Sequence, residues 1–75
     1  MRQLTERDKK NLSRELVKPY VGYYEKCGMA KALEIMGYIT ETTYLVLADN
    51  FEMMEFERIP IGERTIYNIL TLGRW

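Results

Sequence analysis

The sequence predicts a small all-α protein, a bundle of four to five short helices that forms a single domain over residues 1–75. Three observations lead to this fold class. Apolar residues recur at steps of three and four along most of the chain, as they do on the buried side of a helix. Threonines precede two of these segments and can cap them, and single glycines follow where a helix can end. With 47% apolar residues, 75 residues suffice for one core.

The first predicted helix begins after Thr5, whose hydroxyl can accept a hydrogen bond from the first turn. Glu6 and Asp8 follow in that turn, where the positive end of the helix dipole favours acidic side chains. Leu12 and Leu16 then begin an apolar stripe at helical spacing. These signals agree, so the sequence predicts a capped amphipathic helix here.

The stripe is interrupted by Pro19, which either kinks a helix or begins a new one at its first position. We therefore expect the first helix to break near Val17–Lys18 and a second helix to run from Pro19 to Lys26. Gly28 is the expected end of that helix, since glycine readily adopts the left-handed conformation found at helix ends. A third, short helix is predicted over Met29–Met36.

The next helix is predicted to follow a turn at Gly37, with Thr40 as its cap and Glu41 in its first turn. Its apolar residues keep helical spacing; they are Tyr44, Leu47, Ala48, Phe51 and Met54.

Two structures are compatible with the last third of the chain. In the all-α structure the preceding helix continues to Pro60, and a last helix covers Glu63–Leu72. In the alternative, Phe51–Ile61 and Arg64–Leu72 pair as a C-terminal β-hairpin around Gly62–Glu63, which gives an α+β, winged-helix-like fold with three to four helices before the hairpin. Neither arm alternates cleanly and the proline would remove a donor from the ladder, so we favour the all-α structure.

The residue types argue against an enzyme. The chain has one cysteine, Cys27, one serine, Ser13, and no histidine, so a nucleophile beside a suitable base is not indicated. A zinc site has too few ligands, and a disulfide has no second cysteine. We predict no catalytic residues, no metal and no cofactor.

The sequence contains no recognisable signal peptide or membrane-spanning segment. Its first ten residues are charged and lack the apolar segment of a signal peptide. No apolar stretch approaches the ~18 residues of a membrane-spanning helix. We therefore expect a cytoplasmic protein that does not enter membranes.

The charges sum to zero but are sorted along the chain. Residues 1–31 hold eight Lys/Arg and four Asp/Glu, whereas residues 32–63 hold seven acids and one base. Tyrosine and methionine, which are enriched where proteins bind proteins, are abundant. The first functional hypothesis is therefore an inhibitor, adaptor or assembly factor, possibly from a phage or mobile element, that binds a protein with a basic surface and possibly forms a homodimer. Its candidate binding residues are Glu52, Glu55, Glu57, Tyr38 and Trp75.

The second hypothesis is a small DNA-binding transcriptional regulator. The run Gly62-Glu-Arg-Thr-Ile-Tyr-Asn-Ile-Leu70 resembles the second helix of helix-turn-helix regulators and transposase-type domains. This resemblance implies that Arg64, Tyr67 and Asn68 face a DNA groove and that Thr65 touches a phosphate. Because an isoelectric point near 6.3 is low for a domain that binds phosphates, we rank this hypothesis second.

Overall fold

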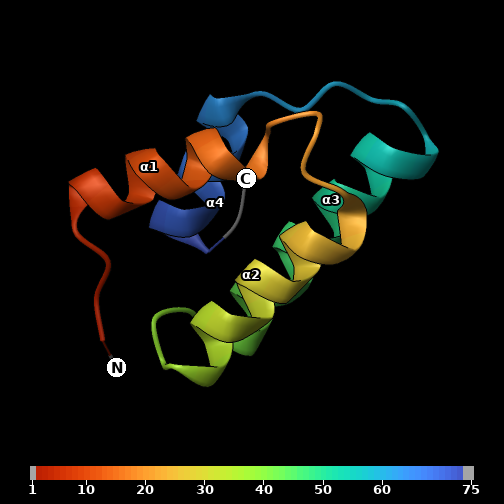
Figure 1. Ribbon diagram of the computed structural model, residues 1–75. Helices are drawn as coiled ribbons and strands as arrows, with labels where there is room; N and C mark the ends of the chain where they lie inside the picture. The colour runs from red at the N-terminus through yellow and green to blue at the C-terminus, as the bar shows by residue number, and fades with distance from the viewer. Residues whose placement is uncertain (1, 74–75) are drawn as a thin grey trace.

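The computed structural model describes residues 2–73, and this part of the chain folds into four α-helices (Figure 1). They are α1 (Glu6–Leu16), α2 (Tyr23–Ile35), α3 (Glu41–Phe56) and α4 (Glu63–Leu72). No strand occurs within residues 2–73. The all-α prediction is therefore confirmed, and the alternative with a C-terminal hairpin is wrong.

The helices are arranged as two pairs. The chain turns back through residues 36–40, so α3 packs antiparallel on α2, while α4 packs on α1 although the two are far apart in the sequence. Figure 1 shows the α1/α4 pair lying across one end of the longer α2/α3 pair. Contacts between α3 and α4 join the pairs into a body of 33 × 20 × 20 Å.

One hydrophobic core lies between the two pairs. Phe51 and Leu47 of α3 are its largest buried side chains together with Leu16 of α1 and two isoleucines of α4. Burial of this apolar surface is the main force that holds the two pairs together. The core residues are Leu16, Ala30, Leu33, Ile39, Leu47, Phe51, Ile66, Ile69 and Leu70.

Both predicted threonine caps are present. Thr5 forms a capping box with Asp8: its hydroxyl accepts from the Asp8 amide at 3.1 Å, and its own amide donates to the Asp8 carboxylate at 3.3 Å. The Thr40 hydroxyl accepts from the Thr43 amide at 3.2 Å. The starts of α1 and α3 therefore follow from hydrogen bonds within three residues.

The predicted helix over Pro19–Lys26 and its end at Gly28 are wrong. Residues 17–22 form an irregular connection, and a single helix, Tyr23–Ile35, runs through Gly28. Glycine inside a helix costs about 1 kcal/mol relative to alanine, a cost that packing of the whole helix against α3 offsets. A Cβ at this position would meet nothing within 4 Å, so no close contact requires the glycine.

The end of α3 is also earlier than predicted. The helix ends at Phe56, and Arg58 adopts a left-handed conformation with φ 54°, while the Ile59 amide donates to the Met53 carbonyl at 3.1 Å. The helix cannot reach Pro60 because a residue that precedes proline is disfavoured in the helical region.

The last helix has the predicted bounds, Glu63–Leu72. It ends at Gly73, where φ is 71° and an added Cβ would lie 3.1 Å from the Thr43 hydroxyl oxygen. Glycine serves both needs, the left-handed turn and the close approach to α3.

Candidate functional surfaces

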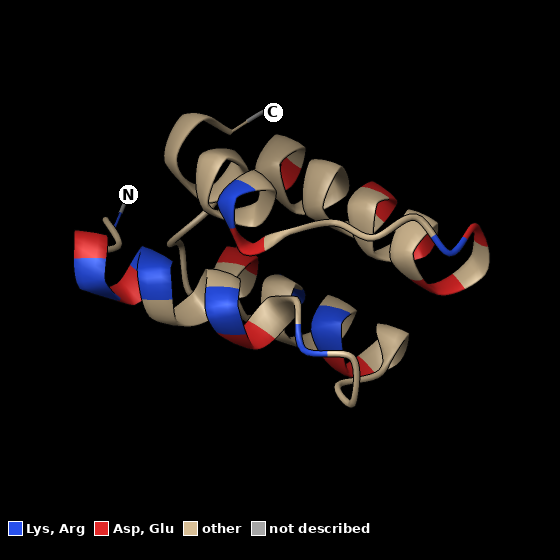
Figure 2. Cartoon of the chain, turned by 90° about the horizontal axis from the view of Figure 1, so that it is seen from above, with Lys and Arg blue, Asp and Glu red and all other residues tan. Residues whose placement is uncertain are grey.

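An acidic helix face distinguishes α3 from the rest of the molecule. The helix carries Glu41, Asp49, Glu52 and Glu55, all exposed, and no lysine or arginine. Figure 2 shows acidic residues along α3, while most of the basic residues lie on α1 and the adjoining segments. The separation of charge seen along the chain is therefore also a separation in space, and it produces a negative potential over α3.

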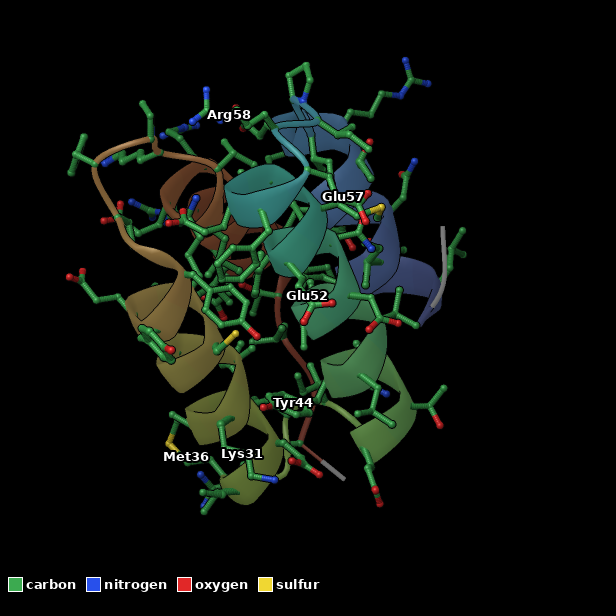
Figure 3. The ribbon with its side chains drawn as sticks, turned by 90° about the vertical axis from the view of Figure 1, so that its right-hand side faces the viewer. Lys31, Met36, Tyr44, Glu52, Glu57 and Arg58 are labelled. Atoms are coloured by element: carbon green, nitrogen blue, oxygen red, sulfur yellow. The ribbon has the colours of Figure 1, made fainter. Side chains whose placement is uncertain are left out.

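The predicted acidic residues are only partly brought together. Glu52 and Glu55 lie one turn apart on α3, and Glu57 is the residue that caps the end of this helix. All three side chains are exposed. Figure 3 shows Glu57 near the end of α3 and Glu52 further back along the helix.

Tyr38 lies away from these acids. It belongs to the connection between α2 and α3, and the sixteen residues of α3 separate it from Glu57, which is about 24 Å at 1.5 Å per residue. Its ring is half-buried against the core and lies 5.6 Å from the Arg2 guanidinium. Trp75, the remaining candidate of this group, lies outside the described residues.

An exposed aromatic cluster lies beside the acidic face. The rings of Tyr23 and Tyr24 meet edge to face at 5.2 Å between centroids, and those of Tyr23 and Phe56 at 5.3 Å. Tyr24 is 84% exposed and Phe56 is 64% exposed, which is unusual for side chains of this size. Spacing could have identified Phe56, because it does not share the stripe of Leu47, Phe51 and Met54.

The neighbourhood of this cluster keeps Cys27 in its neutral form. Burial raises the pKa of the Cys27 thiol, against a hydrogen bond from Tyr23, and the charge of Glu52 raises it further. The hydrogen bond with Cys27 is in turn the main cause of the raised pKa of Tyr23. A neutral thiol is a poor nucleophile, so Cys27 contributes packing here.

The other end of the α2/α3 pair has a different character. The Lys31 ammonium lies 4.9 Å from the centre of the Tyr44 ring and 2.7 Å from the Glu34 carboxylate (Figure 3). The hydrogen bond with Glu34 raises the pKa of Lys31. Ile35 and Met36 are exposed nearby in the sequence. Lys31 and Glu34 therefore already pair with each other at this end.

The basic residues of α1 are joined by one from α4. Arg7, Lys10 and Arg14 follow each other at steps of three and four, so they lie along one side of α1, and all are exposed. Arg64 lines the same shallow hollow of about 350 Å³ as Lys10. The packing of α4 on α1 therefore extends the basic stripe across two helices.

The predicted DNA-reading residues do not act as one group. The Tyr67 hydroxyl donates to the Glu6 carboxylate, which holds the ring against α1. This hydrogen bond is the main cause of the lowered pKa of Glu6 and of the raised pKa of Tyr67. Thr65 and Asn68 are half-buried, whereas Arg64 is exposed. The connection that precedes α4, residues 57–62, is also longer than the three- to four-residue turn of a helix-turn-helix motif.

No group of three or more metal-ligating side chains is found among residues 2–73, and no helix there has the length and apolar character needed to cross a membrane. No family model matches the chain, and neither the curated proteins nor the solved structures include a match to it. Residues 2–73 form a small fold of four helices, and the acidic face, the aromatic cluster and the basic stripe are its candidate binding surfaces.

Proposed function

We propose that this protein is a non-enzymatic protein-binding module, an inhibitor, adaptor or assembly factor, that binds its partner through the exposed face of α2 and α3. The observation that carries this proposal is the aromatic cluster. Tyr24 and Phe56 leave most of their surface in water, although each side chain could bury a large apolar area. Aromatic side chains of this kind are enriched among the residues that contribute most to protein interfaces.

The chemistry of the partner follows from the charge around the cluster. Glu52 lies one turn before Phe56, on a helix without a basic residue. A partner that presents an apolar side chain beside arginine or lysine would fill the aromatic surface and pair with the acids. Arginine suits both elements, because its guanidinium stacks on tyrosine and binds carboxylates.

The test uses a double variant, Tyr24→Ser with Phe56→Ser, and the matched control Leu72→Ser. Leu72 is an exposed apolar residue of α4, outside the proposed face. Affinity capture from the native lysate should recover the same partner with the original protein and the control, and at least about tenfold less with the double variant. Equal capture by all three would contradict the proposal.

Charge provides a second measurement on the same partner. Glu52→Lys should weaken capture, and binding by the original protein should weaken as ionic strength rises, because screening shortens the reach of exposed charges. Capture that is indifferent to both changes would rule out the basic partner. Sedimentation at several concentrations tests whether the same face instead pairs two copies of the chain.

A second candidate function, nucleic-acid binding, is favoured by the position of Arg64 beside the stripe of Arg7, Lys10 and Arg14. With three to four phosphate contacts, the logarithm of the affinity should fall with the logarithm of salt concentration with a slope of about −3. Arg64→Glu should abolish a duplex shift at low salt, while Lys31→Glu on α2 should retain most of it. No shift at low ionic strength would exclude this function.

A further inference from the structure

A groove lies between the two connections that link the helix pairs. It has a volume of about 420 Å³, within the range of small-molecule sites. Its walls are mainly apolar, and residues 17–19 and 58–61 bring segments far apart in the sequence to the two sides of it (Figure 1). The apolar side chains that form it include Val17, Pro19, Phe51, Ile59, Pro60 and Ile61.

Lys26 lines this groove and is only 5% exposed. Four ion pairs occur among residues 2–73, and Lys26 belongs to none of them. Glu55 also lines the groove and influences the amine through space, but it does not come within the 4 Å of an ion pair. Most of the Lys26 side chain is removed from water, although its nitrogen is not a fully buried atom that lacks a partner. Burial lowers the pKa of Lys26, and the charge of Glu55 acts in the opposite direction.

Arg58 also lines this groove, and its backbone adopts a left-handed conformation that is unfavourable for arginine. Its φ is 54°, a region where glycine or asparagine is usual at the end of a helix. Figure 3 shows it beyond the end of α3. Two cationic residues, one largely buried and one with a left-handed backbone, thus line one mainly apolar groove. Departures of this kind from local preference are expected at functional sites.

We propose that this groove binds a small monocarboxylate with a hydrocarbon body, whose carboxylate pairs with Lys26 while the body lies against the apolar walls. A carboxylate would satisfy the buried amine by a charge-assisted hydrogen bond. A phosphate dianion fits less well, because Glu55 also lines the groove and repels two negative charges more strongly than the single charge of a carboxylate.

A peptide fits this groove less well than a small acid. Its backbone would bring amide and carbonyl groups that need hydrogen-bonding partners when they are buried. The walls supply few, since they are apolar side chains and include two prolines, which have no amide hydrogen. The inference does not depend on the proposed partner surface, although Tyr23 borders both.

The test compares octanoate with 1-octanol, a neutral ligand of the same chain length, by NMR titration of the full chain. Octanoate should shift signals of groove residues, including the side chain of Lys26, and bind at least about tenfold more tightly than octanol. Equal affinities, or shifts that do not involve the groove, would overturn the proposal.

The variant Lys26→Met removes the charge and keeps an apolar chain of similar length. It should lose the preference for octanoate over octanol while its amide spectrum remains that of a folded protein. The control Lys10→Met changes an exposed lysine of α1 and should keep the preference. A preference for octanoate that persists in Lys26→Met would contradict the proposal that Lys26 binds the carboxylate.

A third arm separates the small acid from a peptide C-terminus, the main competing occupant. A five-residue peptide that ends in leucine with a free carboxylate is compared with octanoate under the same conditions. Tighter binding of octanoate supports the proposal. Tighter binding of the peptide, with loss of affinity when its carboxylate is converted to an amide, would overturn it in favour of a peptide site.

Discussion

The two helix pairs of this protein differ in the side chains that they expose. Across α1 and α4 the polar side chains reach each other: the Tyr67 hydroxyl donates to Glu6, and the Arg14 guanidinium lies 3.8 Å from the Glu63 carboxylate. The α2/α3 pair instead leaves large apolar side chains in water, namely Tyr24, Ile35, Met36, Leu45 and Phe56. Only Leu72 is comparably exposed on the described part of α4.

On the α1/α4 pair, polar side chains find partners within the protein. On the α2/α3 pair, covering the exposed apolar side chains with another molecule would lower the free energy. Exposed ion pairs such as that of Arg14 contribute little, about 0 to 1 kcal/mol. An exposed aromatic cluster loses contact with water only when a partner binds. The α2/α3 face is therefore the surface on which the proposed interaction depends.

The largest change in stability is expected when Phe51 of α3 is replaced, and Phe56 of the same helix, which is exposed, provides the comparison. Phe51 is 1% exposed in the core, so Phe51→Ala should lower the free energy of unfolding by about 3–5 kcal/mol through lost burial and a cavity. Phe56→Ala should change it by less than about 0.5 kcal/mol. Urea unfolding followed by circular dichroism measures both. Similar losses would show that Phe56 supports the fold and would weaken its proposed role in binding.

A smaller effect, of opposite sign, is expected at the groove between the pairs. Lys26→Met should raise the free energy of unfolding by about 1 kcal/mol near pH 7, because a largely buried amine outside any ion pair is replaced by an apolar chain. Burial lowers the pKa of Lys26 below its unfolded value. Between these two pKa values the unfolded chain binds more protons, so the stability of the original protein rises with pH there.

The difference between Lys26→Met and the original protein should therefore shrink as the pH approaches about 10, the ordinary pKa of lysine. Glu55, Arg58 and Tyr23 also line the groove, and they are the same in both proteins, so the difference isolates the amine. Thermal unfolding at several pH values measures it. A variant less stable than the original would mean that Lys26 has a stabilising partner and is structural.

The left-handed residue after α3 provides a finer comparison with the end of α4. Gly73 already suits its φ of 71°, whereas Arg58 has a φ of 54° with a side chain. Arg58→Gly should therefore raise the free energy of unfolding by about 0.5 kcal/mol, the relief of backbone strain less the entropy of a new glycine. Arg58→Ala keeps the strain and serves as the control. A glycine variant no more stable than the alanine variant would contradict this account.

The smallest effect is expected where α1 and α4 meet. Tyr67→Phe removes the hydroxyl that lowers the pKa of Glu6, so that pKa should move up toward its ordinary value. Because the pKa of Glu6 is lowered in the folded protein, its ionised carboxylate stabilises the fold at pH values above the ordinary pKa. This stabilisation is lost as the pH falls through the lowered pKa, so the stability of the variant should depend less on acid pH. NMR titration of the Glu6 side chain measures the change. An unchanged pKa would show that the hydrogen bond does not persist in solution.

Local chemistry allowed much of the fold to be predicted. Thr5 and Thr40 accept hydrogen bonds from amides three residues away, and the bounds of α4 follow from Gly62 and Gly73 on either side. The same approach failed at Gly28, where the preference of one residue was opposed by the packing of a whole helix. The acidic character of α3 was also predictable, because its segment of the sequence contains four acids and no lysine or arginine.

What the sequence by itself determined was therefore the helical class, the caps and the separation of charge, which depend on residues within about one helical turn. The tertiary structure alone decided that α4 packs on α1, that the Tyr67 hydroxyl donates to Glu6, that Phe56 stays exposed and that most of the Lys26 side chain is buried. Burial and pairing depend on side chains that are distant in the sequence. They become defined only when the helices pack, because that is when water is excluded from one side of each helix.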